Sequence, residues 1–258
     1  VYTLFRETAF FYHLLQISLH IISAILVFHL FKKFLAIPIA FVLAVIFLIH
    51  PMQVESVAYI AASGFQIFFI CGMLALLMSL KKHINKKDSV FIGLLLLLSL
   101  LTRETAILFF ILIPLFQLLY GRKRILLLIS INVVVVGIYS FIRFGIFHSM
   151  LERNSHYPIA QLGFWERLIS IPNIIYYYIK TLIFPSELAI NQHWTVTTHN
   201  LTTFYIPLVI DIFVLSAWLY GGYYLYTKKR SDFTIFLVFS LWIFFGFAML
   251  MQIVPLDM

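Results

Sequence analysis

Long apolar runs separated by short polar clusters dominate this sequence. The runs cover residues 10–31, 34–50, 64–80, 89–101, 105–120, 125–142, 204–226 and 233–254. A helix rises about 1.5 Å per residue, so each run is long enough, or nearly so, to cross a hydrocarbon core about 30 Å thick. Unsatisfied backbone groups are prohibitive in lipid, and the runs are therefore expected to be helical. The pattern predicts an all-α, polytopic transmembrane helix bundle of about eight spans.

The composition supports the same class of protein. Of the 258 residues, 63% are hydrophobic and only 11% are charged, whereas about a quarter of the residues in soluble domains are charged. The sequence contains no internal repeat and no soluble linker, so residues 1–258 are predicted to be a single integral membrane domain. The chain begins at Val1 without an initiator Met and stops directly after an apolar run. We therefore expect it to be a fragment of a longer protein.

Basic residues predict the orientation of the spans. Four clusters hold most of the 18 Lys and Arg residues: Lys32 with Lys33, Lys81 and Lys82 with Lys86 and Lys87, residues 122–124, and residues 228–230. All four fall on one side if the spans alternate, and the positive-inside rule makes that side cytoplasmic. The net charge of +8 is thereby explained without a nucleic-acid partner. Most acids fall on the exterior side: Glu7, Glu55, Glu104, Glu152, Glu166, Glu187 and Asp257.

The segment 166–184 is predicted to lie along the exterior interface instead of crossing the membrane. A further crossing here would move the cluster 228–230 to the outside. Pro172 is expected to divide the segment into pieces too short to span, and Arg167 and Lys180 flank its apolar positions. The whole stretch 143–203 would then be one large exterior element, and loops of that size commonly bind ligands or act as lids.

The stretch from His50 to Ile60 places an imidazole, a helix breaker and a carboxylate where one apolar run ends and the next begins. Glu55 is expected on a short helix at the exterior mouth of two spans, where a carboxylate can act as a base or hold a sugar hydroxyl. Gln53 shares this stretch and is a candidate for substrate binding with His50. Alternatively, Glu55 is a rim acid that interacts with a helix dipole, and His50 is an interfacial residue that ends a span.

Thr102, Arg103 and Glu104 join two of the shortest runs, 89–101 and 105–120. Helices of these lengths fall short of the hydrocarbon core, so the tip of this hairpin should dip below the exterior surface. Charged residues at such a depth usually face a protein interior or a wet cavity. Arg103 suits bidentate phosphate binding, and Glu104 would orient or neutralise it. The alternative is a tight turn that carries a local ion pair between two slightly longer helices.

Three further groups of polar residues were considered as sites. Asn191, His193 and Trp194 are candidates for sugar contact on the exterior loop, although Trp is also a common interface anchor. Asp211 lies inside a span and is a functional candidate unless a neighbouring group satisfies it. His13 and His20 share a helix face and suit packing or hydrogen bonding better than metal binding, because no third ligand converges in sequence. No ATPase, dinucleotide-binding or serine-hydrolase motif is present.

Several blocks occur in a characteristic order: Phe11-Tyr12-His13-Leu14, His50-Pro51-x-Gln53-x-Glu55-x-Val57-Ala58-Tyr59-Ile60, Thr102-Arg103-Glu104, Arg167-Leu168-Ile169 through Phe184-Pro185 to Trp194, and Ile253-Val254-Pro255-Leu256. In that order they resemble the membrane half of GT-C glycosyltransferases of the protein O-mannosyltransferase type, in the transmembrane and tetratricopeptide-repeat branch. The resemblance covers nearly the whole chain. Its most specific block is the His-Pro-x-x-x-Glu stretch.

This resemblance implies a glycosyltransferase that moves a sugar, such as mannose, from a polyprenyl-phosphate carrier to a protein or glycan acceptor. The reaction would take place on the exterior face of a prokaryotic cell membrane, with membrane lipid as a further partner. His50 and Glu55 would line the mouth of the active site, and Arg103 with Glu104 would lie near the carrier phosphate. The residues define no metal site; the resemblance leaves a divalent metal cofactor open.

Two departures from the family pattern bear on this interpretation. The acidic catalytic motif of the family lies in a first exterior loop that would precede Val1, and any tetratricopeptide repeats would follow Met258. In addition, residues 63–66 read Ser-Gly-Phe-Gln where the family often has a basic residue and an Asp, and acids are common in the family near the positions of Asn191 and His193.

The alternative to a glycosyltransferase is a non-enzymatic transporter or lipid-handling protein, which can also use exterior carboxylates and a buried Arg.

Overall fold

The computed structural model describes residues 8–119, 125–146, 161–186, 188, 196 and 199–251, which contain helices and turns but no strand. The chain divides into two compact units, Val1–His148 and Ser149–Met258. We describe each unit by itself. The predicted all-α class is confirmed for the described residues, and each of the eight apolar runs contains a long helix.

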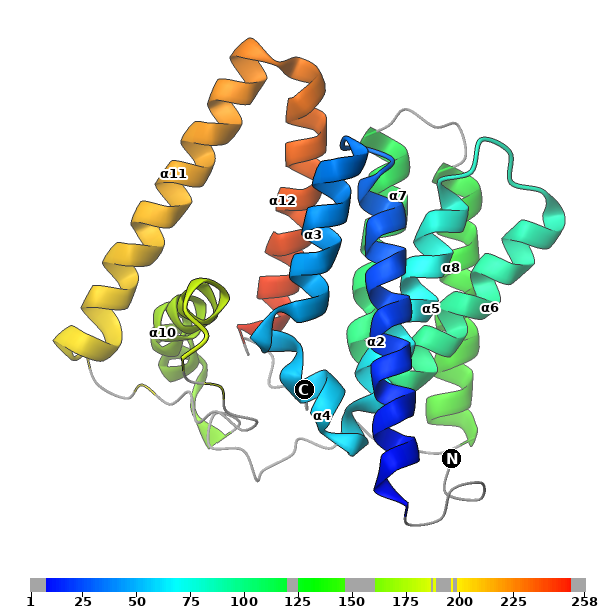
Figure 1. Cartoon of the computed structure of the whole chain (residues 1–258), viewed down its shortest axis with the longest axis horizontal. Helices are drawn as coiled ribbons and strands as arrows, with labels where there is room; N and C mark the ends of the chain where they lie inside the picture. Colours follow the sequence, from blue (N-terminus) through cyan, green and yellow to red (C-terminus); the bar gives the residue numbers. More distant parts are fainter. Residues whose placement is uncertain are drawn as a thin grey trace. The chain divides into compact units, whose positions relative to one another are not determined.

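Unit 1 is built from consecutive helices that run up and down beside one another (Figure 1). Its elements are α2 (Ala9–Phe31), α3 (Ile37–Ile49), η1 (Pro51–Gln53), α4 (Val54–Ala58), η2 (Ile60–Ala62), α5 (Ser63–Ser79), α6 (Lys86–Thr102), η3 (Glu104–Ala106), α7 (Ile107–Leu119), α8 (Ile125–Ser140) and the π-helical turn η4 (Phe141–Ile146). The α2–α3 and α5–α6 connections lie at one end of the unit, and the α6–α7 connection lies with α4 at the other. The predicted alternation therefore holds within unit 1.

Polar side chains join the helices of unit 1 through their backbones. Ser99 donates from α6 to the carbonyl of Phe68 at 2.8 Å, and Gln117 donates from α7 to the carbonyl of Ser79 at 2.6 Å. Both donors are essentially inaccessible. A hydrogen bond between helices is a common source of cohesion where lipid removes most of the hydrophobic drive for association. These residues therefore hold α5 between α6 and α7.

Gly72 allows α5 and α7 to approach closely. A Cβ atom at this position would overlap the ring of Phe109, which is itself buried. We expect Gly72→Ala to lower the free energy of unfolding of the helical bundle by about 1–3 kcal/mol, the usual cost of overpacking a filled core. Thermal unfolding followed by circular dichroism in detergent would measure the change.

Gly137 in α8 supplies the matched control, because an added Cβ there meets nothing within 4 Å. Gly137→Ala should be neutral or slightly stabilising, since alanine favours a helix more than glycine does. An equal loss of stability in the two variants would show that helix propensity, and not the Phe109 contact, governs position 72.

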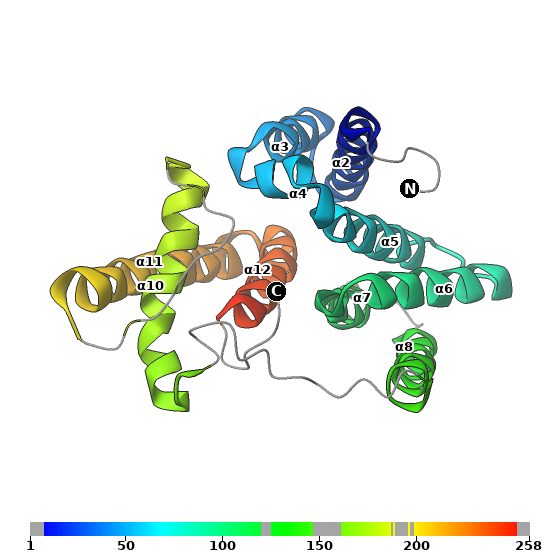
Figure 2. The same ribbon diagram turned by 90° about the horizontal axis from the view of Figure 1, so that it is seen from below.

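The described part of unit 2 contains three long helices, α10 (Phe164–Ile183), α11 (Ile206–Lys228) and α12 (Arg230–Leu250), with the π-helical turn η5 (Leu201–Tyr205) before α11. The indole of Trp218 donates to the Ser240 hydroxyl at 2.9 Å and joins α11 to α12. Helix α10 packs against α11 and crosses it at a steep angle (Figures 1 and 2). This crossing fits a helix that lies along an interface, and the interfacial position stays a prediction.

The prediction that Pro172 divides this segment was wrong. Helix α10 is continuous from Phe164 to Ile183 with Pro172 inside it. A proline removes a single backbone donor, and neighbouring helices can stabilise the bent turn that remains. Packing on α11 therefore outweighs the local preference for a break.

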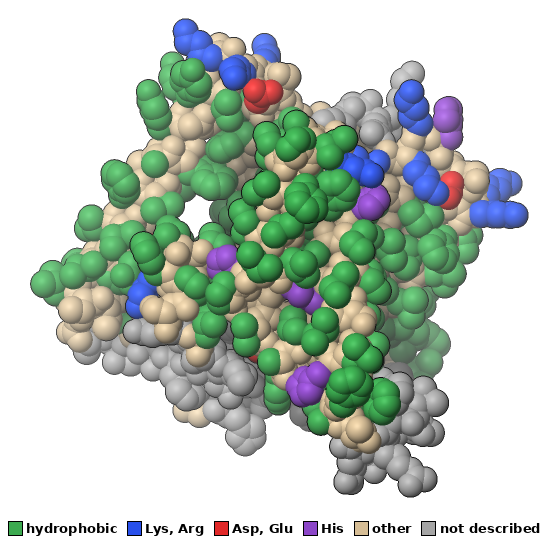
Figure 3. Space-filling model, viewed as in Figure 1, with side chains coloured by type: hydrophobic (Ala, Val, Ile, Leu, Met, Phe, Trp, Pro, Cys, Tyr) green, Lys and Arg blue, Asp and Glu red, His purple; other side chains and the backbone are tan. Residues whose placement is uncertain are grey.

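Five of the described helical segments are long and apolar enough to cross a membrane: Ala9–Phe31, Ile60–Ser79, Ile125–Ile146, Leu201–Lys228 and Arg230–Leu250. The bent pair of Ile37–Ile49 and Pro51–Ala58 would make a sixth. Hydrophobic side chains cover the shafts of the helices, whereas most Lys and Arg side chains in view gather at helix ends (Figure 3). The chain is thus a multi-pass membrane protein. In its described part five or six segments are long and apolar enough to cross a membrane, fewer than the eight predicted.

The orientation of unit 1 can be tested with single cysteines in a Cys71→Ala background. We expect Lys82→Cys, in the α5–α6 connection, to react with a membrane-impermeant thiol reagent only after the membrane is permeabilised. Gln53→Cys, in η1, should react with the same reagent in intact cells. Positions 123, 153 and 193, which lie outside the described residues, extend the test with the same logic. Labelling of position 82 from outside would reverse the predicted orientation.

Candidate functional site

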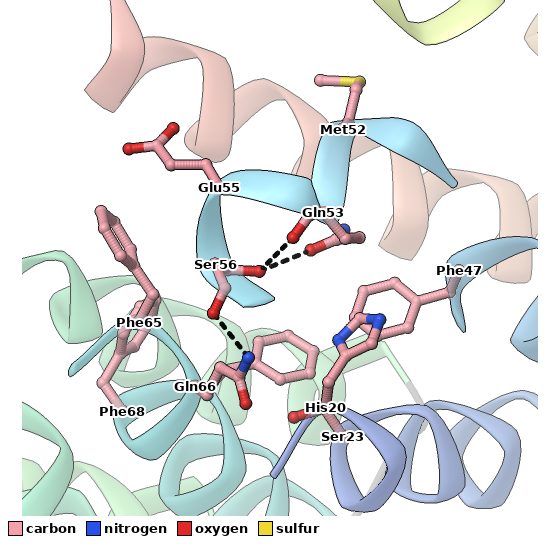
Figure 4. A pocket seen from close by; sticks show the side chains of 11 residues that line it. His20, Ser23, Phe47, Met52, Gln53, Glu55, Ser56, Phe65, Gln66 and Phe68 are labelled. Carbon is pink, nitrogen blue, oxygen red and sulfur yellow. Dashed lines mark hydrogen bonds between the residues drawn. The ribbon is translucent and has the colours of Figure 1, made fainter. Parts of the chain in front are cut away.

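A pocket of about 310 Å³ lies in unit 1, where α2, α3, α4 and α5 meet (Figure 4). Its wall consists of His20, Ser23, Phe47, Met52, Gln53, Glu55, Ser56, Phe65, Gln66, Phe68 and Phe69. The volume falls at the lower end of the range for small-molecule sites. The broken helical segment between α3 and α5 thus forms one side of a cavity.

Two buried glutamines fasten this broken segment. Gln16 donates to the carbonyls of Tyr59 and Ile60 at 2.8 and 2.9 Å, and Gln66 donates to the carbonyl of Ser56 at 2.7 Å. A helix that breaks leaves carbonyl groups without intrahelical partners, and in lipid water cannot satisfy them. The two amides supply the missing donors and fix α4 against α2 and α5.

His50 starts the broken segment. Its Nδ1 accepts a hydrogen bond from the backbone N–H of Met52 at 3.2 Å, which makes it the N-cap of η1. Pro51 at the first position of η1 needs no such partner, because proline has no N–H. His50 is not among the residues that line the pocket. The structure gives it a role in shaping the turn, and its contact with a substrate stays a prediction.

Glu55 lines this pocket, and the charge of Arg103 acts on it. The Arg103 guanidinium lies over the Phe65 ring, with 3.5 Å between its central carbon and the ring centroid. Partial burial raises the pKa of Glu55 above its ordinary value, and the positive charge of Arg103 counteracts part of that rise. Phe65 also lines the pocket. An aromatic ring of the pocket wall therefore also packs against a cation whose charge acts on Glu55.

Glu104 has a different partner from the one predicted. It forms an ion pair with Arg143, which projects from η4 and also donates to the Tyr139 hydroxyl at 2.8 Å. Both charged side chains are partly exposed, so the pair is worth about 1 kcal/mol or less. It ties the α6–α7 tip to the end of α8. The role of Glu104 in orienting or neutralising Arg103 stays a prediction.

The structure brings together some of the predicted site residues. Gln53 and Glu55 line one pocket, and Arg103 lies beside it on Phe65. Asn191, His193 and Trp194 lie outside the described residues. Among the described residues no hydrogen-bond partner reaches either carboxylate oxygen of Asp211, which lies in α11 of unit 2.

Sequence reasoning missed Gln16, Gln66 and Arg143. The two glutamines are polar residues inside apolar runs, which is a signal for a buried hydrogen bond. Arg143 follows the run 125–142 on the side opposite the basic clusters, and this exception to the charge pattern marks it as a candidate site residue.

His20 donates to the carbonyl of Leu48 at 3.0 Å, which confirms the predicted hydrogen-bonding role. No group of three or more His, Cys, Asp or Glu residues in the described ranges is placed to hold a metal.

Comparisons with protein-family models, curated proteins and solved structures found no match to this chain. The case for a function therefore rests on the chemistry of the site and on the resemblance in the order of its motifs.

Proposed function

We propose that this protein is a glycosyltransferase that moves a sugar from a polyprenyl-phosphate carrier to a hydroxyl acceptor at the membrane surface. The observation that carries the proposal is that Glu55 lines one pocket while Arg103 stacks on Phe65, which lines the same pocket. A carboxylate next to a cavity can accept a proton, and a guanidinium can bind a phosphate through two parallel hydrogen bonds. Transfer of a sugar from a phosphate carrier needs both a proton acceptor for the attacking hydroxyl and a cation for the departing phosphate.

In the proposed reaction the acceptor oxygen attacks the anomeric carbon and forms the new glycosidic bond. The bond from that carbon to the phosphate oxygen breaks, and its electron pair leaves with the polyprenyl phosphate. Glu55 takes the proton of the acceptor hydroxyl, and Arg103 compensates the charge that develops on the leaving phosphate. Glu104, paired with Arg143, is assigned to holding the α6–α7 tip that carries Arg103.

A carboxylate on the pocket wall acts as a base when it is ionised, and burial raises the pKa of Glu55 above its ordinary value. Phe65 packs against the guanidinium of Arg103 and restricts its movement. A cation that is already held in place loses less conformational entropy when it binds a phosphate. Arg103 is therefore better suited to phosphate binding than a freely moving surface cation.

The test is a transfer assay with the protein in lipid vesicles, using a polyprenyl-phosphate hexose labelled in the sugar and a Ser/Thr-rich peptide acceptor. The proposal expects label in the peptide and release of polyprenyl phosphate in equal amounts. Movement of the intact labelled donor from one leaflet to the other, with no label in any acceptor, would support the lipid-handling alternative. Omission of divalent cations from a parallel reaction decides whether a metal is needed.

A further inference from the structure

The hydrogen-bonding groups on the pocket wall have an uneven distribution of donors and acceptors. Four polar side chains already donate to backbone carbonyls: Ser23 to Leu19 at 3.0 Å, His20 to Leu48 at 3.0 Å, Ser56 to Gln53 at 2.9 Å, and Gln66 to Ser56 at 2.7 Å. These four donors are therefore engaged within the protein. What the four residues offer a ligand is mainly acceptor capacity.

Gln66 shows this most clearly. Its side chain is only 4% exposed and its Nε2 donates to the carbonyl of Ser56, whereas its buried Oε1 has no hydrogen-bond partner among the described residues (Figure 4). The bound Nε2 fixes the orientation of the amide, so Oε1 cannot exchange places with it. A buried acceptor without a partner is costly, and a ligand that supplies a donor there gains what the free protein lacks.

His20 and Ser23 add to the same character. A carbonyl oxygen only accepts, so Nε2 of His20 must carry the hydrogen in its contact with Leu48, and Nδ1 of the neutral ring is then an acceptor. The Ser23 hydroxyl keeps lone pairs after it donates to Leu19. Both residues line the pocket and are more than nine-tenths buried.

The rest of the wall is aromatic. Phe47, Phe65, Phe68 and Phe69 line the cavity, and the ring centroids of Phe47 and Phe69 stand 5.8 Å apart in a stacked arrangement. Phenylalanine faces favour a ligand with an apolar surface. An anion is disfavoured here, because phosphate oxygens only accept hydrogen bonds and Glu55 adds a negative charge to the wall.

We propose that this pocket binds a neutral ring with several hydroxyl groups and an apolar face, namely a sugar, and that the carrier phosphate stays outside it at Arg103. Gln66 and Ser23 are the residues that accept hydrogen bonds from the ring. The assignment deepens the proposed function and rests on it for the identity of the sugar as the donor hexose.

The experiment measures binding of methyl hexosides to the intact chain in lipid nanodiscs by saturation-transfer NMR, with inorganic phosphate as a competing anion. We expect saturable hexoside binding that phosphate does not displace. Ser23→Ala should weaken this binding by about fivefold and Gln66→Met by about tenfold, the scale of one or two lost hydrogen bonds.

Ser18→Ala is the matched control, since Ser18 lies on the same helix, makes the same kind of bond to the carbonyl four residues earlier, and does not line the pocket. Its hexoside affinity should equal that of the wild type. Gln66→Met also removes the bond to Ser56, so Ser23→Ala, which leaves α4 untouched, decides the case if Gln66→Met misfolds.

The two proposals fail in different ways. Hexoside binding that depends on Ser23 and Gln66, together with an absence of transfer, keeps the sugar pocket and overturns the transferase. Transfer with a donor KM unchanged in both variants keeps the transferase and overturns the sugar pocket. Absence of hexoside binding to the wild type, or displacement of the hexoside by phosphate, also overturns the pocket proposal.

Discussion

Glu55→Gln is expected to reduce sugar transfer by about a hundredfold to ten-thousandfold, the usual contribution of a positioned general base. The amide matches the carboxylate in size but does not take up the acceptor proton. Glu55 is largely exposed, so the structure tolerates the amide and the variant should fold normally. Initial rates at saturating donor, with equal amounts of wild type and variant in vesicles, give the comparison.

The pH dependence of the wild-type rate is a second measure of the same residue. A base works when it is ionised, so the rate should rise as the pH increases through the pKa of Glu55, which burial places above the ordinary carboxyl value. Arg103 lowers that pKa, and Arg103→Gln should therefore move the rising limb to higher pH. Glu55→Gln should lack this limb altogether.

Asp232→Asn serves as the control for a lost carboxylate, because Asp232 is also an acid in the first turn of a helix but belongs to unit 2. Its transfer rate should match that of the wild type. A Glu55→Gln enzyme with full activity and an unchanged pH profile would leave Glu55 as a rim acid and remove the proposed base.

Arg103→Lys is expected to slow transfer by about a hundredfold, corresponding to a loss of about 3 kcal/mol of stabilisation at the developing phosphate charge. Lysine keeps the positive charge but presents it at a point, without the planar fork that binds two phosphate oxygens. The planar group is also what stacks on Phe65. The effect should fall on kcat and on donor affinity, and both are read from transfer rates at varied donor concentration.

Arg230→Lys provides the corresponding control, since Arg230 also lies over an aromatic ring, that of Tyr226 at 5.5 Å, but in unit 2. It should leave transfer unchanged. If Arg103→Lys turns over at the wild-type rate with the wild-type donor affinity, Arg103 is a structural residue of the α6–α7 turn.

The helices of unit 1 and their alternation could be predicted from the residues alone. Apolar runs of this length have one stable backbone arrangement in lipid, because every N–H and C=O must be satisfied within the segment. The Lys clusters at 32–33 and 81–87 lie at the opposite end of unit 1 from Glu55 and Glu104, as their spacing predicts. Glu55 and Arg103 were also identified as candidates from local sequence, because a charge at the edge of an apolar run is conspicuous.

Which side chains meet depends on how the helices pack, and no sequence pattern predicts it. The partners in the pairs Gln16 with Tyr59, Glu104 with Arg143, and Arg103 with Phe65 are separated by more than a helical segment in sequence, and a hydrophobic pattern carries no information about which helix face opposes which. The continuity of α10 through Pro172 was settled in the same way, since the local tendency of proline to break a helix was outweighed by packing against α11. Local preferences amount to a few kcal/mol and act within a turn or two, whereas the pocket depends on contacts that exist only once the helices have packed.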